Sequence, residues 1–204
     1  MPNLDQRIII IKHACQHAID LRRLHKGEFC VFTDDRRLFL AADILHHRDD
    51  NFSVIETTGA KCIVEIGTSS GYSTIWLALA ARANGGHVFT HEIDPEKVNL
   101  ATANFKKAGV DDVITIIEGD AHVTIRQHKE PIDVLFLDAE KQGYLDYLNQ
   151  LLPVIRPGGM ILGHDMHRPM PDPRYLEAVT KSPNLDTSFI MMESYGISFT
   201  VKKR

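Results

Sequence analysis

The spacing of hydrophobic residues changes along this chain and divides it into two parts. Over residues 5–24 and again over residues 34–47, apolar side chains recur every three or four positions, which predicts two amphipathic helices. Beyond them, short apolar runs alternate with helix-forming segments, and this alternation predicts a parallel sheet with helices on both faces. We therefore expect a single domain over residues 1–204, with an N-terminal helical cover (1–58) and an α/β core (59–204).

Segments with the composition of β-strands recur through the core and predict a doubly wound, mostly parallel, seven-stranded sheet. The predicted strands are residues 61–66, 87–93, 113–117, 132–137, 160–163, 187–192 and 197–202. The predicted helices are residues 72–83, 95–108, 141–152 and 174–180, with a short helix that ends near residue 128. Pro157, Gly158 and Gly159 predict a turn before the fifth strand, and residues 194–196 predict a hairpin turn between the last two.

The composition limits the partners and the cellular location. The chain of 204 residues has a formal net charge of −4 and a pI of about 6.2, which argues against a broad nucleic-acid-binding surface. No apolar run reaches the length of a membrane-spanning helix. Cys15, Cys30 and Cys62 are odd in number and lack the spacing of a metal site. We therefore expect reduced thiols, a cytoplasmic protein and no membrane partner.

Residues 61–72 predict a strand, a glycine-bounded turn and the start of a helix, an arrangement that brings backbone N–H groups toward a ligand. Gly67 and Gly71 bound the turn, but their G-x-x-x-G spacing lacks the middle glycine of a dinucleotide-binding loop. Glu65 lies two residues before Gly67, where its carboxylate would repel a pyrophosphate. The position suits a ligand with a cationic group, such as the ammonium or sulfonium of S-adenosylmethionine (SAM). A local role, in which Glu65 caps or pairs with a neighbour, is the alternative.

The sequence E-I-G-T-x-x-G-Y-S in this stretch resembles the first motif of class I SAM-dependent methyltransferases. It is most similar to the O-methyltransferases related to catechol and caffeoyl-CoA O-methyltransferase, and the likeness covers roughly residues 60–165. This resemblance implies a Rossmann-like sheet closed by two final strands and SAM as cofactor. It also implies methyl transfer to a hydroxyl oxygen of a small, aromatic or catechol-like acceptor. In that family the N-terminal helices cover the cofactor or contribute to a dimer, so we expect a homodimer.

Glu92 stands at the end of the second predicted strand, and ligands of such sheets bind outside the carboxyl ends of the strands. It follows Gly67 by 25 positions, a spacing at which a carboxylate accepts both ribose hydroxyls. The alternative is that Glu92 binds no ligand and is only a neighbour of Asp94, which caps the next helix.

The resemblance adds further cofactor contacts. It places Asp120 and the backbone of Ala121 at the adenine, although Asp120 also suits a helix cap. It places Ser69 and Ser73 beside the methionine moiety, although Ser73 suits the first turn of a helix equally well. The full predicted cofactor-binding set is Glu65, Gly67, Thr68, Ser69, Gly71, Ser73, Glu92, Asp120, Ala121 and Asp138.

The fourth and fifth predicted strands end in residues that suggest the chemical step. The O-methyltransferases have Asp-x-x-Lys and Asp-Asn at these places. There the two aspartates and the asparagine hold a divalent cation such as Mg²⁺, which prefers oxygen ligands, and the lysine takes the proton of the acceptor hydroxyl. By this resemblance we expect Asp138 and Asp165 as metal ligands, and Lys141 and Asp138 as catalytic residues. The alternatives are that Asp165 caps a helix or forms an ion pair with Arg168, and that Lys141 is a solvated lysine.

Met166 replaces the expected asparagine, and a thioether is a poor ligand for Mg²⁺. The third ligand is then missing, is replaced by water, or comes from His164 or His167. Without a metal, His164 becomes the candidate base, because its unperturbed pKa suits proton transfer near neutrality. The proline-rich segment 167–175 follows, and we expect it, with Tyr175, to form a wall of the acceptor pocket.

Other functions remain open at this point. SAM-dependent methylation of a hydroxylated tRNA base is one, because relatives within the resembled family modify RNA. The acidic balance counts against it, although the basic residues 202–204 leave some room. A dinucleotide-dependent oxidoreductase fits less well because of the turn spacing and Glu65. A non-catalytic SAM-binding module is supported by Met166 alone.

Overall fold

The structure, a computed structural model, describes most of the chain beyond residue 54. The described residues are 30–32, 38–40, 55–167, 169, 171–190 and 196–204, the first two ranges for their backbone only.

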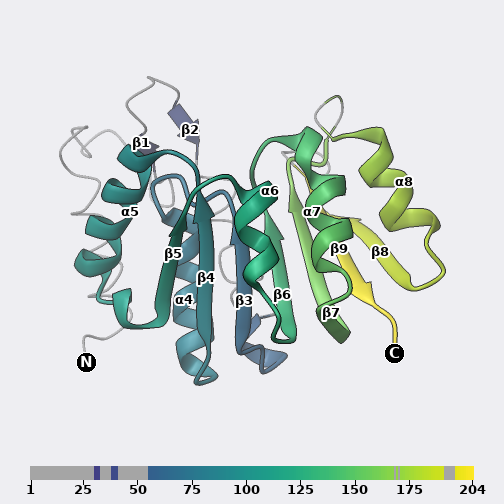
Figure 1. The fold of residues 1–204 in the computed structure, drawn as a ribbon, viewed down its shortest axis with the longest axis horizontal. Coiled ribbons are helices and arrows are strands. Elements are labelled where there is room, and N and C mark those ends of the chain that lie inside the picture. The colour runs from purple at the N-terminus through teal and green to yellow at the C-terminus, as the bar shows by residue number, and fades with distance from the viewer. Residues whose placement is uncertain (1–29, 33–37, 41–54, 168, 170, 191–195) are drawn as a thin grey trace.

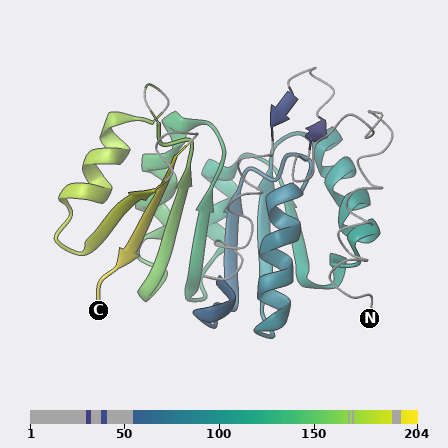
Figure 2. The same ribbon diagram turned by 180° about the vertical axis from the view of Figure 1, so that it is seen from behind.

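A seven-stranded sheet forms the centre of the described part of the chain (Figures 1 and 2). Its strand order is β5-β4-β3-β6-β7-β9-β8. Neighbouring strands are parallel except at β9, which runs antiparallel to both β7 and β8. The strands are β3 (Cys62–Ile66), β4 (His87–Glu92), β5 (Ile114–Glu118), β6 (Ile132–Leu137), β7 (Ile155–His164), β8 (Leu185–Ile190) and β9 (Ile197–Lys202). The predicted sheet is confirmed.

Helices cover both faces of this sheet. α4 (Tyr72–Ala83) and α5 (Pro95–Ala108) contribute to one apolar core, while α7 (Tyr144–Leu151) and α8 (Pro173–Lys181) contribute to the other. Figure 1 shows α7, α8 and the short α6 (Ala121–Thr124) in front of the sheet and α4 behind it. Short 3₁₀ turns, η2 (Asp111–Val113), η3 (Ile125–Gln127) and η4 (Lys141–Gly143), complete the connections. No helix of the described residues is long and apolar enough to cross a membrane.

The starts of α4 and α5 agree with the predicted starts, and the residues next to each start explain why. α4 has the predicted bounds, and its preceding residue, Gly71, adopts a left-handed backbone conformation. Asp94 caps α5 through a hydrogen bond from the Glu96 N–H, and Pro95 opens the helix, as expected for a proline in the first turn.

The turn predicted at Pro157, Gly158 and Gly159 is wrong, because these residues lie inside the long strand β7. The pairing between β6 and β7 shifts register between Ile132 and Val134, and Gly158 has a φ of +78°. The glycines lie in this irregular segment, and pairing with β6 resumes at Met160.

Near the N-terminus, the helix predicted over residues 34–47 is contradicted at β2 (Leu38–Leu40), which pairs antiparallel with β1 (Cys30–Phe32). Both strands are apolar and are separated by polar residues, a pattern that also fits a hairpin. The helix predicted over residues 5–24 and most of the closing hairpin turn lie outside the described residues.

Candidate active site

The loop after β3 passes tightly over the edge of the sheet. Gly67 has a φ of +103°, and a Cβ at this position would lie 2.2 Å from the carbonyl oxygen of Asp138. At Gly71 a Cβ would lie 2.3 Å from the ring of Phe105. The N–H groups of Gly67 and Thr68 both donate to the carbonyl of His91, at 3.1 and 3.2 Å. The two glycines therefore allow the loop to pack against β4, β6 and α5 at once.

Glu65 is fully buried beneath this loop. Its carboxyl accepts hydrogen bonds from the hydroxyls of Ser73 (2.5 Å), Thr74 and Thr90 (2.6 Å). Burial raises the pKa of Glu65 to about 7, although the three hydroxyls lower it. The structure thus shows the local pairing that was the alternative for Glu65, and it engages Ser73 in the same contact. A contact of either residue with a cofactor remains a proposal.

Glu92, at the end of β4, organises the opposite side of the loop. Its carboxylate accepts hydrogen bonds from the backbone N–H groups of Ser69 (2.8 Å), Ile93 (3.0 Å) and Asp94 (3.1 Å). Ser69 adopts a left-handed conformation, with a φ of 50°, at this contact. Glu92 therefore fixes the loop and faces the cavity beside it.

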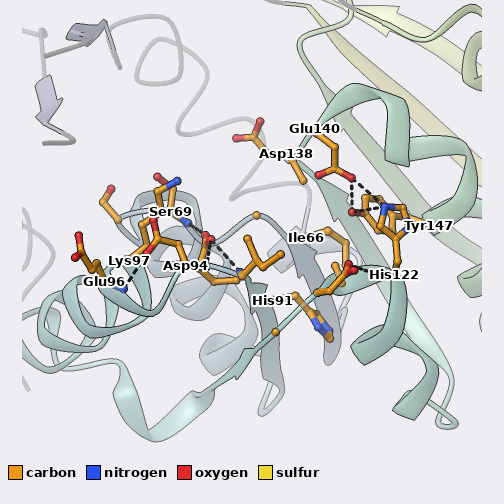
Figure 3. Close-up of a pocket in the computed structure, with 18 of the residues that line it drawn as sticks. Ile66, Ser69, His91, Asp94, Glu96, Lys97, His122, Asp138, Glu140 and Tyr147 are labelled. Carbon is orange, nitrogen blue, oxygen red and sulfur yellow. Dashed lines mark hydrogen bonds and ion pairs between the residues drawn. The ribbon is translucent and has the colours of Figure 1, made fainter. Parts of the chain in front are cut away.

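A cavity of about 980 Å³ opens at the carboxyl ends of the parallel strands. Its lining includes six of the predicted cofactor residues, namely Gly67, Ser69, Glu92, Asp120, Ala121 and Asp138. Asp120 also caps α6 through a hydrogen bond from the His122 N–H, so the capping interpretation holds as well. In Figure 3, Ser69, Asp94 and Glu96 lie on one side of the cavity and Glu140, Tyr147 and His122 on the other.

The second wall of the cavity was not predicted. His122 stacks on Tyr147 with ring centroids 4.6 Å apart, and its Nδ1 lies 2.5 Å from a carboxylate oxygen of Asp146. The Tyr147 hydroxyl donates to Glu140 at 2.5 Å. The hydrogen bond to Asp146, partly opposed by burial, raises the pKa of His122. The place of His122 directly after Ala121 was the available signal, but its partners come from α7 and the loop after β6.

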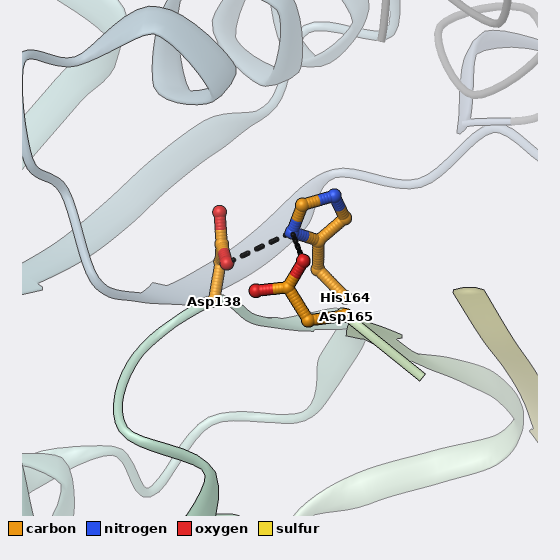
Figure 4. Close-up of side chains that lie close together, drawn as sticks. All are labelled: Asp138, His164 and Asp165. Carbon is orange, nitrogen blue, oxygen red and sulfur yellow. Dashed lines mark hydrogen bonds and ion pairs between the residues drawn. The ribbon is translucent and has the colours of Figure 1, made fainter. Parts of the chain in front are cut away.

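Asp138 joins the cavity to a second group of side chains. Its Oδ1 lies 3.0 Å from Nδ1 of His164, and the same nitrogen lies 3.4 Å from Oδ1 of Asp165 (Figure 4). Among the described residues, these three offer ligand atoms that all lie within 4.8 Å of one another. Burial would lower the pKa of His164, but the hydrogen bond and the negative charges of both aspartates raise it. Burial would raise the pKa of Asp138, and contacts with His164 and Lys141 lower it instead.

Lys141 completes the group and is mostly buried. Its Nζ lies 3.1 Å from Oδ2 of Asp165 and 3.6 Å from Oδ1 of Asp138. It also donates to the hydroxyl of Tyr144 (2.8 Å) and the carbonyl of Ala139 (3.1 Å). The interpretation of Lys141 as a solvated lysine is therefore wrong.

Two residues near this group point elsewhere. Met166 is 1% exposed and belongs to the apolar core that contains α7 and α8. Tyr175 is 0% exposed, packs edge-on against Tyr144 and contacts the Ser198 hydroxyl at 3.1 Å. The prediction that Tyr175 lines the acceptor pocket is wrong, because α8 turns its apolar face to the core. Arg168 lies outside the described residues.

Comparison with known proteins decides the family. A family model described as a methyltransferase domain matches residues 64–166, half of the chain. The chain belongs to this family. The match runs from β3 to the end of β7, so it includes the ends of all five parallel strands that surround the site. The predicted class I methyltransferase family is confirmed.

Relatives of this methyltransferase include two named catechol O-methyltransferases. That of Niastella koreensis is 38% identical over 113 residues, 53% of this chain and 51% of that protein. That of Mycobacterium tuberculosis is 32% identical over 144 residues, 64% of this chain and 65% of that protein. The chain therefore spans half to about two thirds of the length of these relatives. The solved structure of an O-methyltransferase from Bacillus cereus in complex with SAH has a TM-score of 0.73 at 24% identity, and it covers 100% of this chain and 93% of that chain, which shows the shared fold.

Proposed function

We propose that this methyltransferase transfers the methyl group of SAM to a hydroxyl oxygen of a small, aromatic or catechol-like acceptor. One observation carries the proposal: Asp138 lines the cofactor cavity and also contacts His164 at 3.0 Å. A donor that fills the cavity would therefore end beside titratable groups able to take a proton from an acceptor. The relatives named catechol O-methyltransferases support the same substrate class.

The cofactor roles follow from the cavity lining. SAM, when bound, supplies a methyl group on a positively charged sulfur. The carboxylate of Glu92 faces the cavity, where it can accept ribose hydroxyls while it holds the loop. Asp120 and Ala121 lie at the end of β5, where an adenine would be recognised. Carboxylates outnumber lysine and arginine side chains in this lining, which favours a cationic ligand over a dinucleotide pyrophosphate.

The chemical step needs a proton acceptor and an aimed oxygen. Asp138 and Asp165 are the carboxylates that would hold a divalent cation such as Mg²⁺, and such a cation lowers the pKa of an adjacent hydroxyl. Their donor set fits, because a carboxylate oxygen of each lies within 4.8 Å of the other in the structure. Lys141 and His164 are the groups that can take the hydroxyl proton, and both contact the two aspartates.

Methylation of tRNA receives no support from the described residues. Lys202, the first residue of the basic tail, donates to the carbonyls of Leu152 (2.8 Å) and Ile155 (2.7 Å) and so stabilises the fold.

We also propose a homodimer, a cytoplasmic location and the division into a cover (1–58) and a core (59–204).

The proposal is tested by following labelled methyl groups from SAM to a panel of acceptors. We expect methylated product with catechols and none with bulk tRNA. Methylation of tRNA with no product from any catechol or phenol would replace the proposed substrate class. Product from single phenols as readily as from catechols would remove the need for a chelating diol.

A further inference from the structure

Nδ1 of His164 is the nitrogen that faces both carboxylates of the candidate metal site. It points between the two aspartates, 3.0 Å from Oδ1 of Asp138 and 3.4 Å from Oδ1 of Asp165 (Figure 4). The His164 side chain is only 13% exposed, so the ring is held in this orientation by its surroundings. Met166 cannot contribute, since it is buried in the apolar core.

We infer that His164 is a direct metal ligand, and that Asp138, Asp165 and His164 together form a site for a first-row transition cation such as Mn²⁺ or Co²⁺ in preference to Mg²⁺. Imidazole nitrogen favours such cations, whereas Mg²⁺ prefers sites made of oxygen alone. The inference rests on the proposed function, because it takes this site as the place where the acceptor hydroxyl is activated. It departs from the family pattern in both the third ligand and the preferred metal.

The position of Lys141 is compatible with an occupied site. Two of its four contacts, the Tyr144 hydroxyl and the Ala139 carbonyl, are not ligand atoms. A third goes to Oδ2 of Asp165, whereas His164 faces Oδ1 of that residue. The fourth, the longest at 3.6 Å, goes to Oδ1 of Asp138, the oxygen that also faces His164. Lys141 therefore keeps partners when the other aspartate oxygens bind a cation. With His164 bound through Nδ1, Lys141 is the group left to take the acceptor proton.

The first experiment measures the ligand atom itself in the unaltered protein. Electron paramagnetic resonance of Mn²⁺ added to the wild-type protein, saturated with S-adenosylhomocysteine, reports hyperfine coupling from a directly bonded imidazole nitrogen. We expect this coupling in the wild type and its loss in Asp138→Ala, which removes a neighbouring ligand. Bound Mn²⁺ without nitrogen coupling overturns the inference. No binding of Mn²⁺, Co²⁺ or Mg²⁺ to the wild type also overturns it.

The second experiment measures metal preference by calorimetric titration of Co²⁺ and Mg²⁺ into wild type and His164→Asn. Asparagine supplies an amide oxygen in place of the imidazole nitrogen, so we expect the Co²⁺ to Mg²⁺ affinity ratio to fall by about tenfold or more. His87→Asn is the matched control, because His87 lies at the opposite end of β4 and contacts the Thr115 hydroxyl. An unchanged ratio in His164→Asn, with the variant folded by circular dichroism, overturns the inference.

These readouts separate the two proposals. Metal binding with nitrogen coupling, but without methyl transfer from SAM to any acceptor, supports the site and removes the proposed function. Methyl transfer that persists in excess chelator, with no cation bound, removes the site and leaves the proposed function intact.

Discussion

Gly67 and Asp138 meet backbone to backbone, and this contact joins the cofactor loop to the chemical site. A Cβ on residue 67 would lie 2.2 Å from the Asp138 carbonyl oxygen, far inside van der Waals contact. The loop can approach the end of β6 only because residue 67 has no side chain. The cavity proposed to bind SAM and the aspartate that contacts His164 are therefore placed by the same backbone contact.

Substitution of Gly67 tests this contact. We expect Gly67→Ala to destabilise the fold by roughly 2 to 4 kcal/mol, from overpacking against backbone and an unfavourable φ, and to weaken S-adenosylhomocysteine binding. Gly85→Ala is the control, because Gly85 also has a positive φ, 66°, but has nothing near its Cβ position. It should cost only about 1 kcal/mol and leave binding unchanged. Equal effects of the two variants, in denaturant unfolding and calorimetry, would contradict the account.

Local sequence patterns predicted much of this arrangement. The strand, turn and helix around Gly67 depend on neighbours in sequence, so α4 was predicted with its observed bounds. Features that depend on distant partners were not predictable. Glu65 is satisfied partly by Thr90, 25 positions away, and the second cavity wall combines His122 with Tyr147 from α7.

Strand β7 also shows that local composition alone does not predict where an element begins. Pro157 and Gly158 have turn-forming composition, yet they lie within β7. The pairing with β6 passes from Ile155 to Met160, so these residues form an irregular segment between two paired stretches of the strand. Likewise, the helical periodicity around Leu38 gave way to pairing with a strand near Cys30. At β2, contacts between strands override local preference.

The buried carboxyl of Glu65 predicts a dependence of stability on pH. Its folded-state pKa of about 7 lies above its ordinary value of 4.5, so the folded protein binds more protons than the unfolded chain between these values. The contribution is fully present below pH 4.5 and is lost as the pH rises through about 7. Relative to Glu65→Gln, the free energy of unfolding of the wild type should fall by up to about 3 kcal/mol over this range. Parallel stability curves for the two proteins would contradict the burial argument.

Lys141 should act on turnover rather than on cofactor binding. It contacts both aspartates and the Tyr144 hydroxyl and is absent from the cavity lining. We expect Lys141→Met to lower kcat by about 100-fold or more, because a proton acceptor is lost, while affinity for S-adenosylhomocysteine stays within about threefold. Steady-state kinetics and calorimetry on the same preparation check this. Unchanged kcat would exclude Lys141 from proton transfer.

Replacement of Met166 by the asparagine found in the family should destabilise the fold. Because its side chain lies in the apolar core, Met166→Asn places an amide there and should destabilise the fold by about 2 kcal/mol without raising affinity for Mg²⁺. Met166→Leu, a swap of similar volume, should cost less than about 1.5 kcal/mol. A gain in Mg²⁺ affinity in Met166→Asn, at full stability, would show that residue 166 faces the metal site.

The central claim, that the cavity beside Glu92 binds SAM, is tested most directly by calorimetric titration of S-adenosylhomocysteine into the wild type and Glu92→Ala. The account predicts one site per chain in the wild type and at least about tenfold weaker binding in the variant, because Glu92 both holds the Ser69 backbone and lines the cavity where we propose that the ribose binds. No binding to the folded wild-type protein, or equal binding by the variant, would contradict it.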